Sequence, residues 1–169
     1  FKIISLGMGM QSTAMYLMSS MERIERADYA IFADPGAEHI KTYELMVWLI
    51  AWQKENNGIP IIVDQSKNLL NDILKKINST GQRWASIPAF GESGGMVRRQ
   101  CTAEYKINPV VRSARKLMGI KPHQRMKPCE MWLGISLDEA TRMKESRLYN
   151  IKYRYPLIEE KMRRSDCVT

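Results

Sequence analysis

The chain has 169 residues, and its 26 Lys and Arg against 18 Asp and Glu give a formal net charge of +8. Hydrophobic residues make up 44% and charged residues 26%, a composition typical of soluble globular proteins that excludes a disordered chain. No apolar run reaches the roughly 18 residues of a membrane span. One domain over residues 1–169 is expected, and three widely spaced cysteines favour reduced thiols and a cytoplasmic location.

The first half predicts alternating strands and helices. Short apolar runs that end at glycines or at Asp-Pro-Gly indicate buried strands, and apolar residues at helical spacing indicate the helices between them. The predicted strands are residues 2–6, 29–33 and 59–63, and the predicted helices are residues 12–22, 39–57 and 68–78. Repeated strand–helix units with apolar strands predict an α/β fold, a parallel sheet covered by helices.

The second half is less regular. Residues 82–95, rich in glycine, predict a long loop, and a helix is expected from Asn108 to Met118, closed by Gly119. A strand over residues 131–135, a short helix over 138–146 and an extended segment over 151–158 follow. Ser165 and Asp166 are typical of a helix start, so the C-terminal end is expected to be incomplete.

The charge is unevenly distributed. Residues 1–90 carry nine basic and nine acidic side chains, whereas residues 91–169 carry seventeen basic and nine acidic ones. This asymmetry predicts an anionic partner such as phosphate, nucleotide or nucleic acid, with a solvated basic face as the alternative.

The first candidate site is the loop after the first strand, Ser5 to Thr13. Gly7 and Gly9 allow a sharp turn that brings backbone N–H groups close to an anion. Gln11, Ser12 and Thr13 lie at the start of a helix, where unpaired N–H groups and the helix dipole favour phosphate. The alternative is a tight strand–helix turn with Ser12 as an ordinary N-cap.

The second candidate site follows the second strand and contains Asp34, Gly36 and Glu38. In a parallel sheet it lies at the same edge as the first loop, where ligands bind near the reversal of strand order. Its carboxylates could accept hydrogen bonds from a ribose or base, or hold a metal. The alternative is ordinary turn chemistry at Asp-Pro-Gly.

The third candidate site contains Arg98, Arg99, Cys101 and Lys106. Arginine offers forked donors to phosphate, and surrounding cations lower the pKa of a thiol. The alternative is a surface basic patch beside a core cysteine.

The fourth candidate site follows the last strand and contains Gly134, Glu139 and Arg142. Glu139 and Arg142 are three residues apart and share one helix face, so Arg142 could reach a phosphate while Glu139 positions it. An intrahelical ion pair behind an N-cap is the alternative.

Taken in this order, the four segments resemble the phosphoadenosine-phosphosulfate (PAPS) reductase-like family of the adenine-nucleotide α-hydrolase superfamily, which includes the PP-loop ATPases. In that family's Ser-Gly-Gly-x-Asp-Ser pattern, Gly9 and Ser12 match, whereas Gly7, Met8 and Gln11 depart. Further matches are carried by the residues Asp34, Gly36, Thr42, Arg99, Cys101, Thr102, Lys106, Gly134, Glu139 and Arg142.

The resemblance implies a Rossmann-like three-layer α/β/α fold with a mostly parallel sheet that binds ATP or PAPS. With the resemblance we expect catalytic roles for Arg99, Cys101 and Lys106. The residues expected to bind the nucleotide are Ser5, Gly7, Gly9, Gln11, Ser12, Thr13, Asp34, Gly36, Glu38, Gly134, Glu139 and Arg142. The sequence leaves Mg²⁺ and an iron–sulfur cluster as open cofactors and predicts no metal ligands. The reductases' C-terminal Glu-Cys-Gly motif is not present in the 169 residues.

Three functions follow as hypotheses. The first is a PAPS reductase-like enzyme acting near the α-phosphate or sulfate of an adenine nucleotide. The second is PP-loop ATP-dependent sulfur transfer to, or modification of, a nucleic acid, favoured by the basic run from Arg112 to Lys127. The third is a non-catalytic nucleotide-binding protein, favoured by the neutral Gln11. No membrane partner is expected, and the sequence does not define an oligomeric state.

Overall fold

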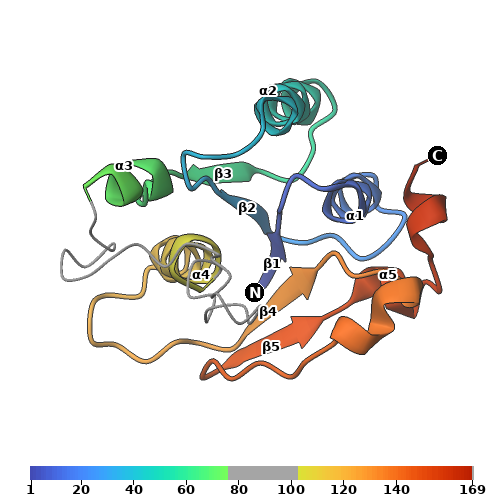
Figure 1. Cartoon of the computed structure of the whole chain (residues 1–169). Coiled ribbons are helices and arrows are strands. Elements are labelled where there is room, and N and C mark those ends of the chain that lie inside the picture. The colour runs from blue at the N-terminus through green and yellow to red at the C-terminus, as the bar shows by residue number, and fades with distance from the viewer. Residues whose placement is uncertain (76–102, 169) are drawn as a thin grey trace, which may run out of the picture.

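The chain is described here by a computed structural model, which covers residues 1–75 and 103–168 (Figure 1). The strands of the described residues are β1 (Lys2–Ser5), β2 (Tyr29–Ala33), β3 (Ile61–Asp64), β4 (Cys129–Leu133) and β5 (Ile151–Arg154). The α-helices are α1 (Met10–Ser20), α2 (Ile40–Glu55), α3 (Leu69–Leu74), α4 (Asn108–Leu117) and α5 (Pro156–Glu159). Shorter helical turns are a π-helical turn (Ala103–Ile107) and two 3-10 turns (Leu137–Arg142 and Arg164–Cys167).

The five strands form one sheet in the order β3-β2-β1-β4-β5, and every pair is parallel. The order runs outward from β1 in both directions, so the direction in which the chain adds strands reverses between β1 and β4. This confirms the predicted α/β fold with a parallel sheet covered by helices.

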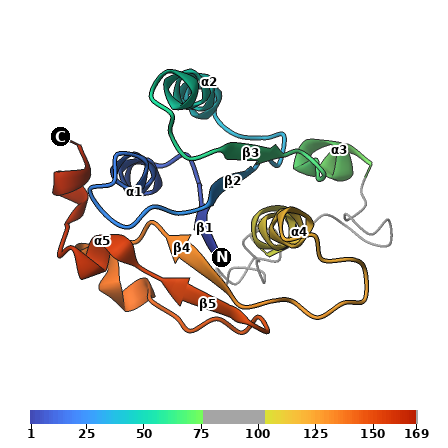
Figure 2. The ribbon, with the colours of Figure 1, turned by 180° about the vertical axis from the view of Figure 1, so that it is seen from behind.

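Successive residues of each strand point to opposite sides of the sheet, and helices cover both sides, so both faces of the sheet are buried. Ile4 and Trp132 pack with residues of α1, α2 and α5 on one face, whereas Ile3 and Met131 pack with residues of α4 on the other. Figures 1 and 2 show α1 and α2 on one side of the sheet and α4 on the opposite side. Burial on both faces explains why the inner strand β2 is uniformly apolar, whereas the edge strand β5 carries Lys152 and Arg154.

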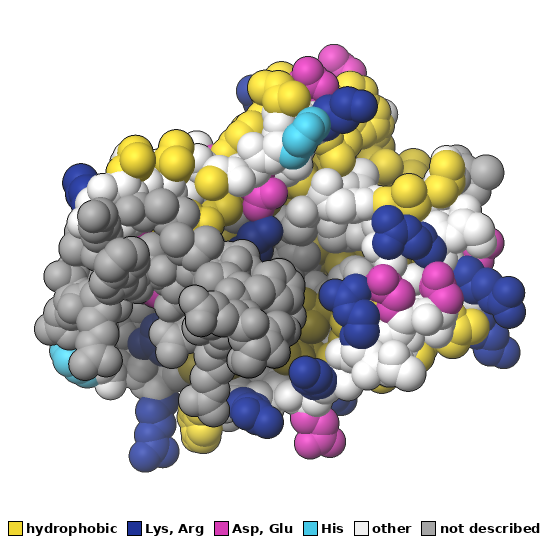
Figure 3. Space-filling model, in the orientation of Figure 1, with side chains coloured by type: hydrophobic (Ala, Val, Ile, Leu, Met, Phe, Trp, Pro, Cys, Tyr) yellow, Lys and Arg dark blue, Asp and Glu magenta, His cyan; other side chains and the backbone are white. Residues whose placement is uncertain are grey.

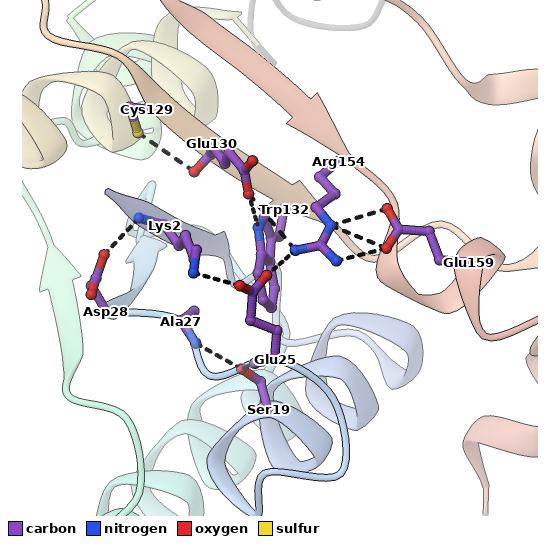
Figure 4. Close-up of polar contacts among 10 residues, drawn as sticks. All are labelled: Lys2, Ser19, Glu25, Ala27, Asp28, Cys129, Glu130, Trp132, Arg154 and Glu159. Atoms are coloured by element: carbon purple, nitrogen blue, oxygen red, sulfur yellow. Dashed lines mark hydrogen bonds and ion pairs between the residues drawn. The ribbon is translucent and has the colours of Figure 1, made fainter.

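Arg154, at the end of β5, is the centre of a polar network on the α1 side of the sheet (Figure 4). Its guanidinium forms ion pairs with Glu25 and with Glu159, the latter at 2.8 Å, and lies 4.8 Å from the ring centre of Trp132. Lys2 pairs with the same Glu25 at 2.6 Å. The network ties β1, β4 and β5 to the loop after α1, so the charge of Arg154 is already compensated.

Two predicted elements near the C-terminus are only partly correct. The helix predicted over 138–146 is a 3-10 turn that ends at Arg142, because Met143 adopts an extended backbone. The Tyr155 hydroxyl then holds Lys144 by hydrogen bonds to its backbone N–H and carbonyl, at 3.0 and 2.6 Å. The extended segment predicted over 151–158 is β5 followed by α5, since Pro156 occupies the first helical position, where its missing N–H costs nothing.

The predicted helix over 68–78 is observed as α3, and its last residues, like the predicted loop over 82–95, lie outside the described residues. Gly119 closes α4 as predicted. Its φ is +66°, and the Ile120 N–H donates to the Arg115 carbonyl at 2.9 Å, the hydrogen bond of a left-handed C-terminal cap. Glu22 holds the same position after α1 with a φ of 58°, although it has a side chain.

These two caps give a stability test. We expect Gly119→Ala to lower the free energy of unfolding by about 1 kcal/mol, because a left-handed backbone is strained for any residue with a Cβ. An added Cβ at Gly119 meets no atom within 4 Å, so a loss of stability would report backbone strain and not a steric clash. The matched Glu22→Gly variant should instead raise the free energy of unfolding. Urea denaturation measures both, and an unchanged midpoint for Gly119→Ala would contradict the assignment.

Candidate functional site

Three of the four predicted segments meet at the carboxyl edge of the sheet. Because all strands are parallel, the loops after β1, β2 and β4 leave from the same edge. β1 and β4 are neighbours in register, with Ser5 opposite Leu133, so their loops diverge at the reversal of strand order. Ligands of open α/β sheets bind at such a point.

Among the described residues, no side chain from another element caps the first turn of α1. The Ser12 hydroxyl turns back onto Gly9, accepting its N–H at 3.2 Å and donating to its carbonyl at 3.0 Å. Among the described residues, the N–H groups of Met10, Gln11 and Ser12 have no hydrogen-bond partner. The turn therefore presents unpaired donors, and the positive end of the helix dipole, at the carboxyl edge.

Met8 shapes the loop that leads into α1. Its φ is +53°, a left-handed conformation that favours glycine, and its side chain is nevertheless buried in the core. Burial of the Met8 side chain offsets the strain.

Gly134 brings the loop after β4 against the first turn of α1. A Cβ added at Gly134 would lie 2.7 Å from both the Cα and the backbone N of Ser12. Only glycine fits at this separation, so the residue sets how closely β4's loop and α1 approach.

Side chains join the same two loops. The Gln11 amide donates to the Ser136 hydroxyl at 3.1 Å and to the Glu139 carboxylate at 2.9 Å. Ser136 is fully buried and donates in turn to Asp138 at 2.6 Å. The two N–H donors of Gln11 are thus both used within the protein, which leaves its amide oxygen for other contacts.

Arg142 is held by Glu139 at the rim of this network. The two side chains form an ion pair of 2.8 Å, as their spacing predicts, while 65% of the Arg142 side chain is exposed. Arg164 lies 3.9 Å from the second oxygen of Glu139. The hydrogen bond from Ser136 lowers the pKa of Asp138, so this carboxyl stays ionised. Arg142 has further N–H donors that face solvent beside the α1 turn.

Asp34 holds the loop after β2 together. It is 4% exposed, and its oxygens accept hydrogen bonds from the Gly36 N–H at 2.8 Å, the Tyr43 hydroxyl at 2.9 Å and the Gln65 amide at 3.0 Å. Burial raises the pKa of Tyr43, and the neighbouring Asp34 carboxylate adds to the rise. Asp34 therefore has a structural role, and its predicted contact with a ligand remains a prediction.

Glu38 and Lys106 bring the second and third segments together. The Lys106 ammonium, from the π-helical turn, lies 2.7 Å from the Glu38 carboxylate. The pair bridges the loop after β2 to the turn that precedes α4, and half of the Lys106 side chain remains exposed. Arg98, Arg99, Cys101 and Thr102 of the same predicted segment lie outside the described residues.

The remaining predicted residues lie near the same edge. Ser5 is the last residue of β1, and Gly7 is exposed in the loop that follows. The buried hydroxyl oxygen of Thr13 has no hydrogen-bond partner in the described part of the chain. Gly36 has a φ of +71°, and a Cβ there would lie 2.7 Å from the Asn68 amide nitrogen.

Sequence reasoning assigned no role to Ser136, Tyr43 or Gln65. Ser136 lies inside the fourth predicted segment, and its position at the end of a predicted strand could have identified it as a site residue. Tyr43 and Gln65 contact Asp34 from nine and 31 positions away, and no local pattern marks such contacts.

The described cysteines are not activated thiols. Burial raises the pKa of Cys129 to about 11 and raises that of Cys167 as well. No group of three or more His, Cys, Asp and Glu side chains within residues 1–75 and 103–168 is arranged to hold a metal ion. Over the same residues, every helix is too short or too polar to span a bilayer.

Comparisons with protein-family models, curated proteins and solved structures find no match to this chain. The fold and the site geometry are therefore the observations from which a function is inferred.

The Gly134 contact can be tested directly. We expect Gly134→Ala to lower the free energy of unfolding by about 1–3 kcal/mol, because the new methyl group overlaps the backbone of Ser12. Gly7→Ala is the matched control, since its Cβ would meet only the Ser12 hydroxyl at an ordinary 3.8 Å. Thermal and urea unfolding of both variants provide the measurement, and equal stabilities would refute the close approach.

Proposed function

We propose that this chain is a PAPS reductase-like enzyme that binds an adenine nucleotide, ATP or PAPS, at the carboxyl edge between β1 and β4. The reaction takes place near the α-phosphate or sulfate of that nucleotide. The observation that carries the proposal is the first turn of α1, where the N–H groups of Met10, Gln11 and Ser12 have no partner among the described residues and Gln11 shares the Glu139 carboxylate with the exposed Arg142. Unpaired N–H groups at a helix start, next to a forked cation, suit phosphate and sulfate oxygens.

The strand order supports the same proposal. The order 3-2-1-4-5 is that of doubly wound, Rossmann-like nucleotide-binding sheets, whose ligands lie at the reversal of strand order. The four-segment resemblance adds the expectation of an adenine nucleotide, which the geometry alone does not specify.

The proposed chemistry is electrostatic. The α1 N–H groups and Arg142 neutralise oxygens that gain charge as the bond at phosphorus or sulfur breaks. Glu139 positions Arg142 and, through Gln11, holds the loop after β4 against α1. Lys106 supplies a second cation, held by Glu38.

The donor set does not suit a resident Mg²⁺ ion. Gln11 replaces the aspartate of the PP-loop pattern with a neutral amide, and both carboxylates nearby, Asp138 and Glu139, already accept hydrogen bonds. We therefore derive no step through a protein-held metal. Any cation that accompanies the nucleotide is part of the substrate.

Two other functions are each favoured by one observation. A non-catalytic nucleotide-binding protein is favoured by the neutral Gln11, whose amide hydrogens are both used internally. ATP-dependent modification of a nucleic acid is favoured by the basic segment before β4, whose Lys121, Arg125 and Lys127 form no ion pair with any described residue. Pyrophosphate release on adding ATP and a candidate acceptor separates catalysis from binding alone.

Binding is tested by calorimetric titration of ATP and PAPS, with and without Mg²⁺. We expect Arg142→Gln to weaken nucleotide binding by about tenfold or more, because a charged hydrogen bond to a phosphate is lost. Arg23→Gln is the matched control, an exposed arginine in the turn after α1, and should leave the affinity unchanged. Absence of binding by the unmodified protein at millimolar nucleotide would contradict the proposal.

A further inference from the structure

Five exposed basic side chains lie at the opposite, amino edge of the sheet. We call this set the amino-edge surface; it consists of Lys121, Arg125, Lys127, Arg147 and Lys152. The first three belong to the segment before β4, Arg147 precedes β5, and Lys152 is the second residue of β5. None of the five forms an ion pair with a described residue.

The segments that carry these cations are held together by hydrogen bonds. The Asn150 amide donates to the Met126 carbonyl at 2.7 Å, between Arg125 and Lys127. The Cys129 N–H donates to the Asn150 carbonyl at 2.9 Å. The cations of both segments therefore occupy one continuous and ordered stretch of surface.

Arg115 orders the start of the same surface. Its guanidinium donates to the carbonyls of Lys121 and Gln124, at 3.3 and 2.7 Å. The two backbone carbonyls thus accept hydrogen bonds from an arginine of α4, and the Lys121 side chain forms no ion pair with a described residue.

The charge at the two edges of the sheet differs in kind. At the carboxyl edge, Lys106 pairs with Glu38, and Arg142 and Arg164 contact Glu139. Figure 3 shows basic and acidic side chains next to one another on the side where Figure 1 places α5. The five cations of the amino-edge surface, by contrast, have no ion-pair partner among the described residues, which favours a polyanion there.

Aromatic and apolar groups accompany these cations. A groove of about 520 Å³ runs along the open edge of β5. Its walls include Met143, Ile151, the partly exposed Tyr153 and the buried Tyr155, and its charged lining residues are Lys144, Glu145 and Lys152. Tyr149, in the turn before β5, is 65% exposed. Exposed rings between cations are the combination that stacks bases and neutralises phosphates in single-stranded nucleic acids.

Two simpler roles for the surface explain less. A lysine on an edge strand keeps that edge from pairing with other chains, which accounts for Lys152 but not for the four cations outside β5. Pairing of two copies through β5 would bring the exposed Lys152 of each chain toward that of the other, and like charges disfavour it.

We propose that the amino-edge surface binds single-stranded nucleic acid, with the phosphates along the five cations and bases against Tyr149 and the walls of the groove. The proposal uses none of the residues assigned to the nucleotide, although the groove extends to Met143 and Tyr155 at the carboxyl end of β5. It names the surface on which the second candidate function, modification of a nucleic acid, would hold its acceptor. Each proposal can therefore fail without the other.

The test is fluorescence anisotropy of the whole chain with a labelled single-stranded oligonucleotide of about 15 nucleotides. Salt is varied from roughly 50 to 200 mM. The triple variant Arg125→Gln/Arg147→Gln/Lys152→Gln should bind more weakly, and the slope of log K against log salt should fall by about 2, since each phosphate contact contributes roughly 0.7.

The matched control is Lys41→Gln/Lys54→Gln/Lys75→Gln, which removes the same charge from exposed lysines on and beside α2 and α3. It should retain most of the affinity and slope. Tyr149→Ala should weaken binding about fivefold or more with an unchanged slope, because a stacking contact is lost and no charge is removed.

Three results would overturn the proposal. The first is an equal loss of affinity in the two triple variants, which would mean that oligonucleotide binding depends only on the net charge of the protein. The second is equal affinity for heparin or for phosphatidylserine vesicles, which would indicate any polyanion or an anionic membrane. The third is no binding to the oligonucleotide at low salt. Unchanged thermal unfolding of the variants shows that a loss of binding is not a loss of folding.

Discussion

The close contact between Gly134 and the first turn of α1 is the constraint on which the site depends. The all-parallel sheet brings the loops after β1 and β4 to one edge, but a residue with a Cβ at position 134 would keep them apart. With glycine there, Gln11 reaches Ser136 and Glu139 across the gap. Glu139 in turn positions Arg142 beside the unpaired N–H groups of α1. A small residue thus determines where donors and cation converge.

The sheet also separates two kinds of positive charge. Cations at the carboxyl edge are paired with carboxylates, as Lys106 is with Glu38, so they are positioned rather than free. Such pairs suit a specific small anion, because their geometry is fixed before binding. The five cations of the amino-edge surface have no ion-pair partner among the described residues, and their attraction to an extended anion is correspondingly long-ranged. One fold can therefore present a small-anion site and a polyanion surface without interference between them.

Local pattern predicted much of this architecture. Uniformly apolar strands indicated a parallel sheet, and the loop and turn residues placed Gln11, Asp34 and Glu139 at one edge. The sequence could not show that Asp34 is enclosed by Tyr43 and Gln65, because those contacts join three separate loops. It predicted the pair of Arg142 with Glu139 from their spacing, but not the pair of Lys106 with Glu38, which lie 68 positions apart. The cations grouped by Asn150 and Met126 come from two segments whose contact only the sheet order brings about.

The central claim is that an adenine nucleotide binds at the first turn of α1, and backbone amide NMR tests it most directly. Addition of ATP to ¹⁵N-labelled protein should shift the amide signals of Met10, Gln11 and Ser12 most, because their N–H groups would gain phosphate acceptors. The Arg142 side-chain signals should move with them. Shifts confined to the amino edge, around Lys127 and Lys152, would contradict the account and place the nucleotide on the polyanion surface instead.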